Sequence, residues 1–312
     1  MNTMKAVRIH NNGDSGVLIY EDAPVPSILP DEVLIKVHSA GVNPVDWKIR
    51  TGYGSYKDAY TFPLILGWDV AGYIASVGPL IKSFQVGDPV FARPDPSRNG
   101  AYAEYAAVRG FEIARAPMNI SLQEAAGIPL ASQTAWMAIF EKGNLQKGQR
   151  ILIQGASGGV GIFAVQFAKL ANAYVIATTS AKNADLVRSL GADEVIDYKT
   201  EDFNKNLSGI DLVLDTIGGE TQAASWQVIR KGGLLVSIVG ADEKAAERFG
   251  VRAVSFRMTS NGARLSEIGA LVDAGLVRVI IEKEFALPEA KAAHDLSESG
   301  HAVGKIILRV LQ

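Results

Sequence analysis

The 312-residue sequence contains no cysteine. Disulfide bonds, thiolate nucleophiles and cysteine-ligated zinc are therefore excluded. A surplus of positive charge is also missing, because 31 lysines and arginines stand against 33 acidic residues and the formal net charge is −2. Proteins that bind nucleic acid depend on basic residues to neutralise phosphates, so this class is disfavoured.

Long hydrophobic runs are absent as well. Apolar stretches such as residues 232–240 (GGLLVSIVG) are far shorter than the roughly 20 residues that cross a bilayer, and residues 1–10 lack the apolar core of a signal peptide. We therefore expect a soluble, cytoplasmic protein without a membrane anchor. Its 48% hydrophobic and 21% charged residues are ordinary for a globular protein, and its length predicts two domains.

The pattern of the chain changes near Ser121. Before it, short alternating segments separated by Gly and Pro predict strands at residues 32–39, 69–77, 88–92 and 101–108. After it, helical segments alternate with predicted strands at residues 150–154, 174–178, 194–197, 211–215 and 234–239, which indicates a parallel sheet covered on both faces. The final strand, 305–310, is too little for a domain of its own. We expect a mainly β domain from residues 1–120 and 258–312, and an α/β domain from 121–257.

Residues 150–161 (RILIQGASGGVG) place a strand, a glycine turn and a helix in succession. This order is typical of a dinucleotide-binding loop, with the phosphates held by amides at the helix N-terminus. Gly158 would let the backbone approach the pyrophosphate, and Gly161 would let the helix pack on the strand. A plain tight turn with Ser157 as N-cap is the alternative, but the following strands favour the cofactor. The predicted loop residues are Ala156, Ser157, Gly158, Gly159, Val160 and Gly161.

The segment after the second strand indicates which dinucleotide is bound. An NAD site places an acid about 20 residues beyond the glycines, whereas residues 178–182 (TTSAK) carry none. Ser180 can donate a hydrogen bond to a 2′-phosphate, and Lys182 can offset its charge. The alternative is a capped helix with a solvated lysine. The missing acid favours NADPH over NADH.

Several motifs together resemble the quinone oxidoreductase branch of the medium-chain dehydrogenase/reductase superfamily. The resemblance covers nearly the whole chain, and its segments are residues 40–52 (AGVNPVDWKIRTG), 66–72 (LGWDVAG), 133–136 (QTAW), 155–161, 191–198 (GADEVIDY), 215–219 (DTIGG), 231–240 and 300–310. It implies a GroES-like domain, a Rossmann domain inserted into it, a cleft for the nicotinamide and a homodimer. It also implies that Ser180, Lys182 and Tyr198 surround the 2′-phosphate, and that Val239, Gly240 and Thr134 lie near the nicotinamide.

The sequence departs from the zinc-dependent members of that superfamily. Those relatives have a cysteine near residues 43–46, a Gly-His-Glu where this chain has Gly67-Trp68-Asp69, and often a four-cysteine lobe near residues 93–100. None of the four histidines stands at a ligand position. We therefore expect no metal and no zinc-bound alkoxide chemistry.

Asn43 and Tyr53 are the candidate catalytic residues. Asn43 precedes Pro44, so it reads as a helix N-cap with proline at the first helical position; the resemblance also implies a place in the substrate cleft. The Tyr53 phenol could hydrogen-bond a carbonyl oxygen or supply a proton. The alternative is a half-buried loop tyrosine without a chemical role.

Three functions remain open at this point. The first is a quinone reductase, in which NADPH gives a hydride to a quinone. The second is an enal or enone reductase, in which the hydride goes to the β-carbon of an activated alkene. The third is an NADPH-binding structural or regulatory protein without turnover. Fold and cofactor motif do not separate them.

Overall fold

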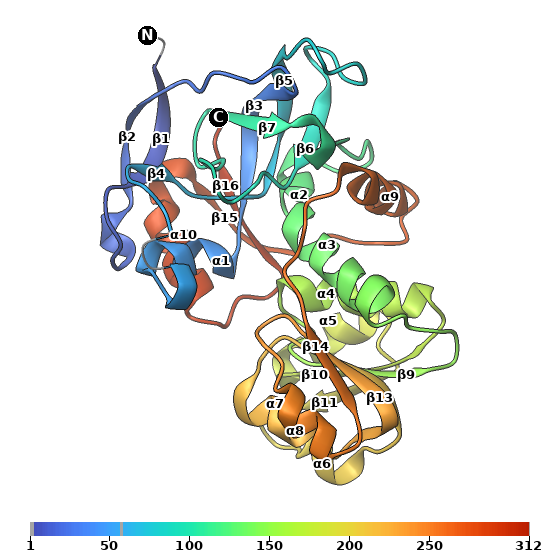
Figure 1. Ribbon diagram of the computed structural model, residues 1–312. Coiled ribbons are helices and arrows are strands. Elements are labelled where there is room, and N and C mark those ends of the chain that lie inside the picture. The colour runs from blue at the N-terminus through green and yellow to red at the C-terminus, as the bar shows by residue number, and fades with distance from the viewer. Residues whose placement is uncertain (1–2, 57–58, 312) are drawn as a thin grey trace. The chain divides into compact units, whose positions relative to one another are not determined.

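The computed structural model describes residues 3–56 and 59–311. The chain forms two compact units, Met1–Leu130 with Ser260–Gln312, and Ala131–Thr259 (Figure 1). The first is mainly β and the second is α/β, which confirms the expected fold class. Among the described residues no helix is long and apolar enough to cross a membrane.

The first unit is built on two sheets. One has the order β2-β1-β4, and the other has the order β15-β16-β3-β5-β6-β8, with β7 also paired to β3. Met4 and Ala6 of β1 are buried while Thr3 and Lys5 are exposed, so alternation buries one face in the first part of the strand. The strands are β1 (Thr3–Ile9), β2 (Ile19–Pro24), β3 (Glu32–Val42), β4 (Leu64–Ile65), β5 (Val70–Val77), β6 (Pro89–Ala92), β7 (Tyr105–Arg109), β8 (Ile113–Arg115), β15 (Ile281–Ala286) and β16 (Lys305–Arg309).

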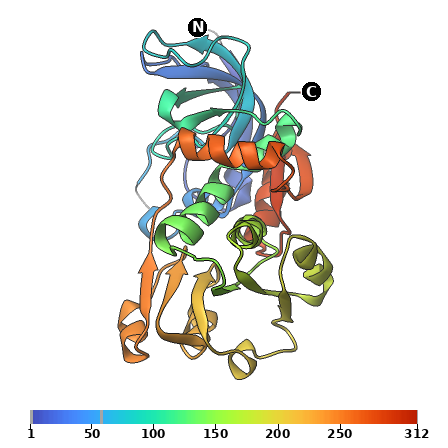
Figure 2. The same ribbon diagram turned by 90° about the vertical axis from the view of Figure 1, so that its right-hand side faces the viewer.

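The end of the chain returns to the sheet of the first unit. β16 pairs antiparallel with β3, with Ile306 opposite Val42, so the last strand lies beside one formed near the start of the chain. Helix α9 (Gly262–Asp273) packs against β8, as Figure 2 shows, and α10 (Ala290–Glu298) packs against α1 (Pro44–Thr51) and β16.

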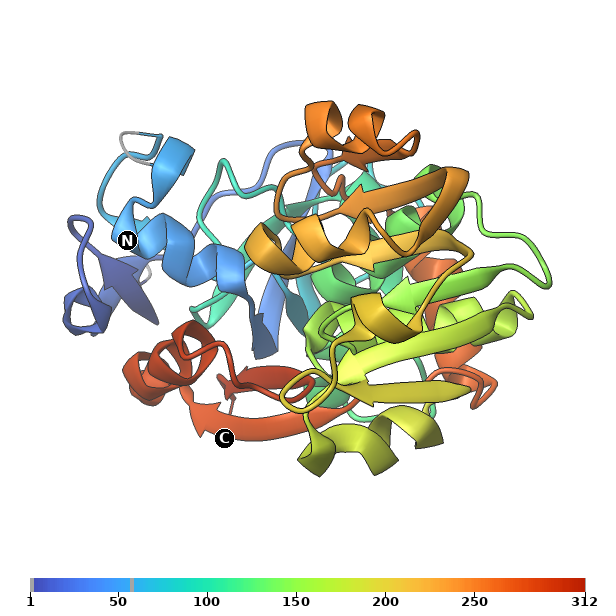
Figure 3. The same cartoon turned by 90° about the horizontal axis from the view of Figure 1, so that it is seen from below.

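The second unit is a doubly wound parallel sheet with the order β11-β10-β9-β12-β13-β14 (Figure 3). Numbered along the chain this order is 3-2-1-4-5-6, the Rossmann arrangement. Leu212, Val213 and Leu214 are all buried, as expected for a parallel strand covered on both faces. The strands are β9 (Arg150–Ile153), β10 (Tyr174–Thr179), β11 (Glu194–Asp197), β12 (Ile210–Asp215), β13 (Ile229–Ser237) and β14 (Arg252–Ser255).

The helices of the second unit connect these strands. They are α4 (Gly159–Leu170), α5 (Ala184–Ser189), α6 (Phe203–Asn206), α7 (Gly219–Ser225) and α8 (Glu243–Arg248). Helix α3 (Pro129–Trp136) begins in the first unit and continues into the second. The units meet along the chain at residues 130/131 and 259/260, whereas we expected 120/121 and 257/258. The first difference arises because α2 (Leu122–Ala126) packs against β3 and β5.

Candidate functional site

The predicted cofactor loop lies at the carboxyl end of β9, beside the point where the strand order reverses between β9 and β12. Ligands of doubly wound sheets bind at this point. Ala156 is fully buried, and its N–H donates to Thr178 O at 3.0 Å, which joins the loop to β10. Ala156 therefore forms the turn at the position where dinucleotide-binding loops usually have their first glycine.

Gly158 and Gly161 have different roles in the loop. A Cβ on Gly161 would lie 2.4 Å from Gly155 O and 2.6 Å from Ala156 Cα, so only glycine lets α4 approach the strand. A Cβ on Gly158 would meet only one protein atom within 4 Å, Gly155 O at 3.3 Å, so most of the space above it is open. Gly158 is the N-cap of α4, and Gly159 and Val160 form its first turn, whose N–H groups lack helical partners. This open cradle fits a pyrophosphate.

Ser157 connects the loop to the segment that follows β10. The helix N-cap is Gly158, so Ser157 is not the cap that the alternative interpretation required. Its hydroxyl oxygen accepts from Thr179 Oγ1 at 2.9 Å and from Asn183 Nδ2 at 3.2 Å. Asn183 also donates to Ser180 Oγ at 3.3 Å. The predicted phosphate loop and the predicted 2′-phosphate segment are therefore held together.

Ser180, Lys182 and Tyr198 lie at neighbouring strand ends. Thr179 is opposite Asp197 in the β10–β11 register, and Tyr198 N donates to Thr179 O at 3.3 Å. Tyr198 is 56% exposed. Lys182 is exposed, and no hydrogen bond or ion pair engages it among the described residues. The Asp197 carboxylate accepts from Lys199 N and Thr200 Oγ1, so it is occupied by its own turn.

Val239 and Gly240 follow β13 and are held by a buried polar network that the sequence analysis missed. Asp215 ends β12 and accepts hydrogen bonds from Gln222 Nε2 at 2.6 Å and Ser237 Oγ at 2.9 Å. Ser237 Oγ in turn accepts from Val239 N, and Gln222 Nε2 donates to Gly240 O at 2.7 Å. Val239 is 45% exposed at this edge. The sequence signal for this network was the segment at residues 215–219 (DTIGG), which entered only as part of the family resemblance.

Thr134 lies on a different element from these residues. It is in α3 and is only 6% exposed. Its predicted place near the nicotinamide stays a prediction.

In the first unit, Asn43 is the N-cap residue of α1 with Pro44 at the first helical position, as predicted. Its side chain is used elsewhere. The amide Nδ2 donates to Asp69 Oδ2 at 2.7 Å, and the amide oxygen accepts a short hydrogen bond from the Lys305 ammonium. The Asn43 backbone N–H donates to Asp46 Oδ2 at 2.8 Å. Three atoms of Asn43 are thus hydrogen-bonded within the protein. Asn43 and its partners Asp46, Asp69 and Lys305 are all buried.

Asp46 belongs to a second buried chain of polar groups. Tyr102 OH donates to Asp46 Oδ2 at 2.8 Å, and His294 Nε2 lies 3.3 Å from the same hydroxyl. Burial raises the pKa of Asp46 to about 7, although the hydrogen bonds from Asn43 and Tyr102 oppose the shift. Burial, with the nearby Arg50 charge, lowers the pKa of His294 to about 3, so the imidazole is neutral. Gly67 permits this arrangement, because a Cβ there would lie 2.2 Å from the Tyr102 ring.

Tyr53 is not brought to Asn43. The two residues flank opposite ends of α1, whose eight residues span about 12 Å. Tyr53 is 65% exposed, and its ring makes an edge contact with Trp47 at 6.4 Å between centroids. The structure therefore separates the two predicted catalytic side chains.

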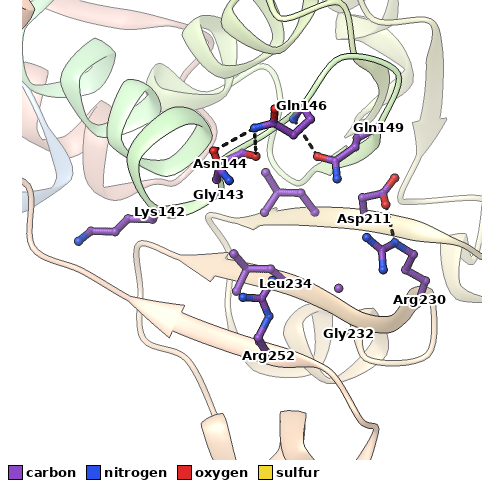
Figure 4. A pocket seen from close by; sticks show the side chains of 12 residues that line it. Lys142, Gly143, Asn144, Gln146, Gln149, Asp211, Arg230, Gly232, Leu234 and Arg252 are labelled. Atoms are coloured by element: carbon purple, nitrogen blue, oxygen red, sulfur yellow. Dashed lines mark hydrogen bonds and ion pairs between the residues drawn. The ribbon is translucent and has the colours of Figure 1, made fainter.

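A cavity of about 180 Å³ lies at the opposite, amino-terminal edge of the Rossmann sheet (Figure 4). Its polar groups bind one another. Gln146 Nε2 donates to Asn144 Oδ1 at 2.9 Å, the Gln146 backbone N–H donates to Gln149 Oε1 at 2.8 Å, and Arg230 pairs with Asp211. It is smaller than typical ligand pockets and lies at the wrong strand ends for a dinucleotide. It is lined by Lys142, Gly143, Asn144, Gln146, Gln149, Asp211, Leu212, Arg230, Gly232, Gly233, Leu234 and Arg252.

Comparison with known proteins decides the family. The model "Alcohol dehydrogenase GroES-like domain" matches residues 29–118, and "Zinc-binding dehydrogenase" matches residues 190–308. "NAD(P)H oxidoreductase RTN4IP1, mitochondrial" of Danio rerio is 36% identical, with 99% of this chain and 92% of that protein covered. This chain belongs to the medium-chain dehydrogenase/reductase superfamily. It is an oxidoreductase of that superfamily.

Two further members are similar over the full chain. "NADPH-dependent alkenal/one oxidoreductase, chloroplastic" of Arabidopsis thaliana is 36% identical, with 98% of this chain and 79% of that protein covered. The structure of the quinone oxidoreductase from Coxiella burnetii is 32% identical and superposes with a TM-score of 0.95, covering 99% of this chain and 100% of that one. The cytoplasmic location and the homodimer stay predictions.

One matching family model has zinc in its name, but the residues of this chain do not fit a zinc site. Among the described residues no group of three or more His, Cys, Asp or Glu side chains could hold a metal ion. Trp68 is buried and donates its indole N–H to Arg98 O at 3.1 Å. The buried Asp69 carboxylate accepts from Asn43 and Leu130, and the buried Asp46 carboxylate accepts from Tyr102 through Oδ2. The chain has no cysteine, and the Trp68 indole, which only donates, cannot ligate zinc in the place of a histidine.

Proposed function

We propose that this protein reduces quinones with NADPH, without a metal. The cradle above Gly158, where an added Cβ would meet only Gly155 O, is the observation that carries the cofactor assignment. NADPH supplies the hydride when bound. The protein's own contribution is to hold the dinucleotide and to align and polarise an acceptor that is already electron-poor.

The preference for NADPH rests on charge at the ends of β10 and β11. Ser180 and Lys182 stand where an NAD-binding acid would stand, and Lys182 has no partner among the described residues that would compete with a phosphate. The carboxylate at the end of β11, on Asp197, is held within its own turn. The name of the Arabidopsis relative, NADPH-dependent, supports this assignment.

Asn43 is the proposed donor to the acceptor's oxygen. Quinones and conjugated carbonyls place developing negative charge on an oxygen as hydride arrives. A preorganised N–H at that oxygen stabilises the charge, and loss of one such donor reduces turnover by about 10²–10³. Asn43 keeps one amide N–H after its bond to Asp69. A quinol oxygen can take its proton from water, so no acid from the protein is needed.

Reduction of conjugated alkenals and enones is the second candidate, favoured by the alkenal/one relative, which is at least as similar as the quinone relative. That reaction needs a proton delivered to carbon, and the exposed Tyr53 phenol is the candidate donor. Binding of NADPH without turnover on either acceptor would instead favour the regulatory role.

The experiment compares kcat for one quinone and one enone in the unmodified protein and in Tyr53→Phe. We expect quinone turnover in both proteins and a larger loss with the enone in the variant. If Tyr53→Phe leaves both rates unchanged, the tyrosine is structural. If the unmodified protein reduces the enone and not the quinone, the second candidate replaces the first.

A further inference from the structure

Asn43 lies between two buried charges that come from neighbouring strands. Lys305 begins β16, and Asp69 immediately precedes β5; β3, which ends just before Asn43, pairs with both strands. The Lys305 ammonium is 3.2 Å from Asp69 Oδ2, and both side chains are essentially inaccessible to solvent. Burying an ion pair costs desolvation, and an apolar pair of similar volume is often no less stable. A role other than stability therefore has to be considered.

The chemistry of the two neighbours allows only one orientation of the Asn43 amide. An ammonium only donates hydrogen bonds and an ionised carboxylate only accepts them. The amide oxygen must therefore face Lys305 and the NH₂ group must face Asp69, which is the observed arrangement. A flipped amide would place donor against donor and acceptor against acceptor.

Both charged groups are themselves fully engaged. Lys305 Nζ donates to Asn43 Oδ1, to Asp69 Oδ2 and, at 3.4 Å, to Val42 O, which uses its three hydrogens. Asp69 Oδ1 accepts from Leu130 N at 2.6 Å. Neither side chain can turn away without losing bonds inside the protein. Within residues 3–56 and 59–311, the second N–H of the Asn43 amide has no acceptor.

We propose that Lys305 and Asp69 are positioning residues that fix the Asn43 amide so that its second N–H is directed to the acceptor's carbonyl oxygen. This inference rests on the proposed function, because it requires Asn43 to act on the acceptor. It identifies the buried ion pair as part of the reductase machinery, acting through Asn43 without touching the acceptor.

The test is a double-mutant cycle between Lys305→Met and Asn43→Ala, measured with a quinone. Each single variant should lower kcat by about 10²-fold, since each removes the oriented donor, with little change in KM or in NADPH affinity. In the Asn43→Ala background, Lys305→Met should lower kcat no further. Lys305→Arg, which can still donate to the amide oxygen, should recover much of the rate.

Two further variants separate positioning from stability. If Lys305→Met does not fold, Lys305→Met/Asp69→Asn removes both charges together and should show the same loss of kcat. Arg98→Met is the matched control, because it removes the cation from the buried Glu32 carboxylate in the same unit. It should lower the melting temperature and leave kcat unchanged.

Additive losses in the cycle would overturn the positioning role while leaving Asn43 as a donor. A full kcat in Lys305→Met together with a reduced kcat in Asn43→Ala would also overturn the positioning role and leave Asn43 as a donor. Full kcat in Asn43→Ala would overturn both this inference and the role of Asn43 in the proposed function.

Discussion

Asp46 is a carboxyl group that the fold takes entirely out of water. Burial raises its pKa to about 7, far above its ordinary value near 4. Between these two values the folded protein binds a proton that the unfolded chain does not. The free energy of unfolding therefore falls as pH rises through this window, by at most about 1.4 kcal/mol per pH unit from this group.

Asp46→Asn should remove that dependence, because its amide oxygen still accepts hydrogen bonds and carries no charge. We expect the unfolding free energy of the variant, relative to the unmodified protein, to rise from pH 4 to pH 7 and then to level off. Denaturant unfolding at pH 5 and pH 8 measures the difference. A difference that is equal at both values would show that Asp46 has an ordinary pKa in the folded state.

Substitution of Lys182 tests whether the protein prefers NADPH to NADH. Lys182→Ala should weaken NADPH binding by about ten- to a hundredfold, because a charge-assisted contact contributes roughly 1.5–3 kcal/mol. NADH binding should hardly change, since NADH lacks the 2′-phosphate. Lys199→Ala, one residue beyond Tyr198, is a matched neighbouring control. Equal binding of both dinucleotides by the unmodified protein would contradict the assignment.

At the scale of elements, the β9–α4 turn depends on two glycines for different reasons. Gly161→Ala places a Cβ against the backbone of Gly155 and Ala156, so it should lower both the melting temperature and NADPH affinity. Gly158→Ala meets only one protein atom, Gly155 O at 3.3 Å, and should lower the melting temperature less than Gly161→Ala while reducing NADPH affinity. Thermal unfolding and a binding titration separate the two. Unchanged NADPH affinity in Gly158→Ala would mean that no phosphate approaches there.

Sequence periodicity predicted the elements whose neighbours are close in the chain. The strand at 150–154 and the helix after it appear as β9 and α4, and Ser121 and Glu124, three residues apart, form a capping box at the start of α2. The strand predicted at 101–108 appears only from Tyr105. Ala101 and Tyr102 instead bond to Gly67 and Leu66 of a distant loop, which no local pattern reveals.

In the candidate site, contacts between residues far apart in the sequence were even less predictable from local patterns. The loop residues 156–161 follow from one motif, whereas the polar partners of Asn43 come from positions 69 and 305. Their meeting depends on the pairing of β16, β3 and β5, which lie far apart in sequence. The sequence therefore predicted Asn43 as an N-cap and a candidate, but not what holds its side chain.

For the whole molecule, the proposed function is NADPH-dependent reduction without a metal, restricted to acceptors that are already electron-poor. In a zinc-dependent relative a Lewis acid polarises the carbonyl, so simple ketones and alcohols react. Here the chain lacks cysteine, and its described residues offer no ligand cluster to replace it. Acceptor conjugation should therefore decide the rate.

The most direct measurement is NADPH consumption by protein dialysed against a chelator, with a quinone, a conjugated enone and the saturated ketone of the same carbon skeleton. We predict undiminished turnover after dialysis with the quinone, and with the enone if Tyr53 serves as an acid, and almost none with the saturated ketone. Stoichiometric zinc lost together with activity, or comparable rates with the saturated and the conjugated ketone, would contradict this proposed function.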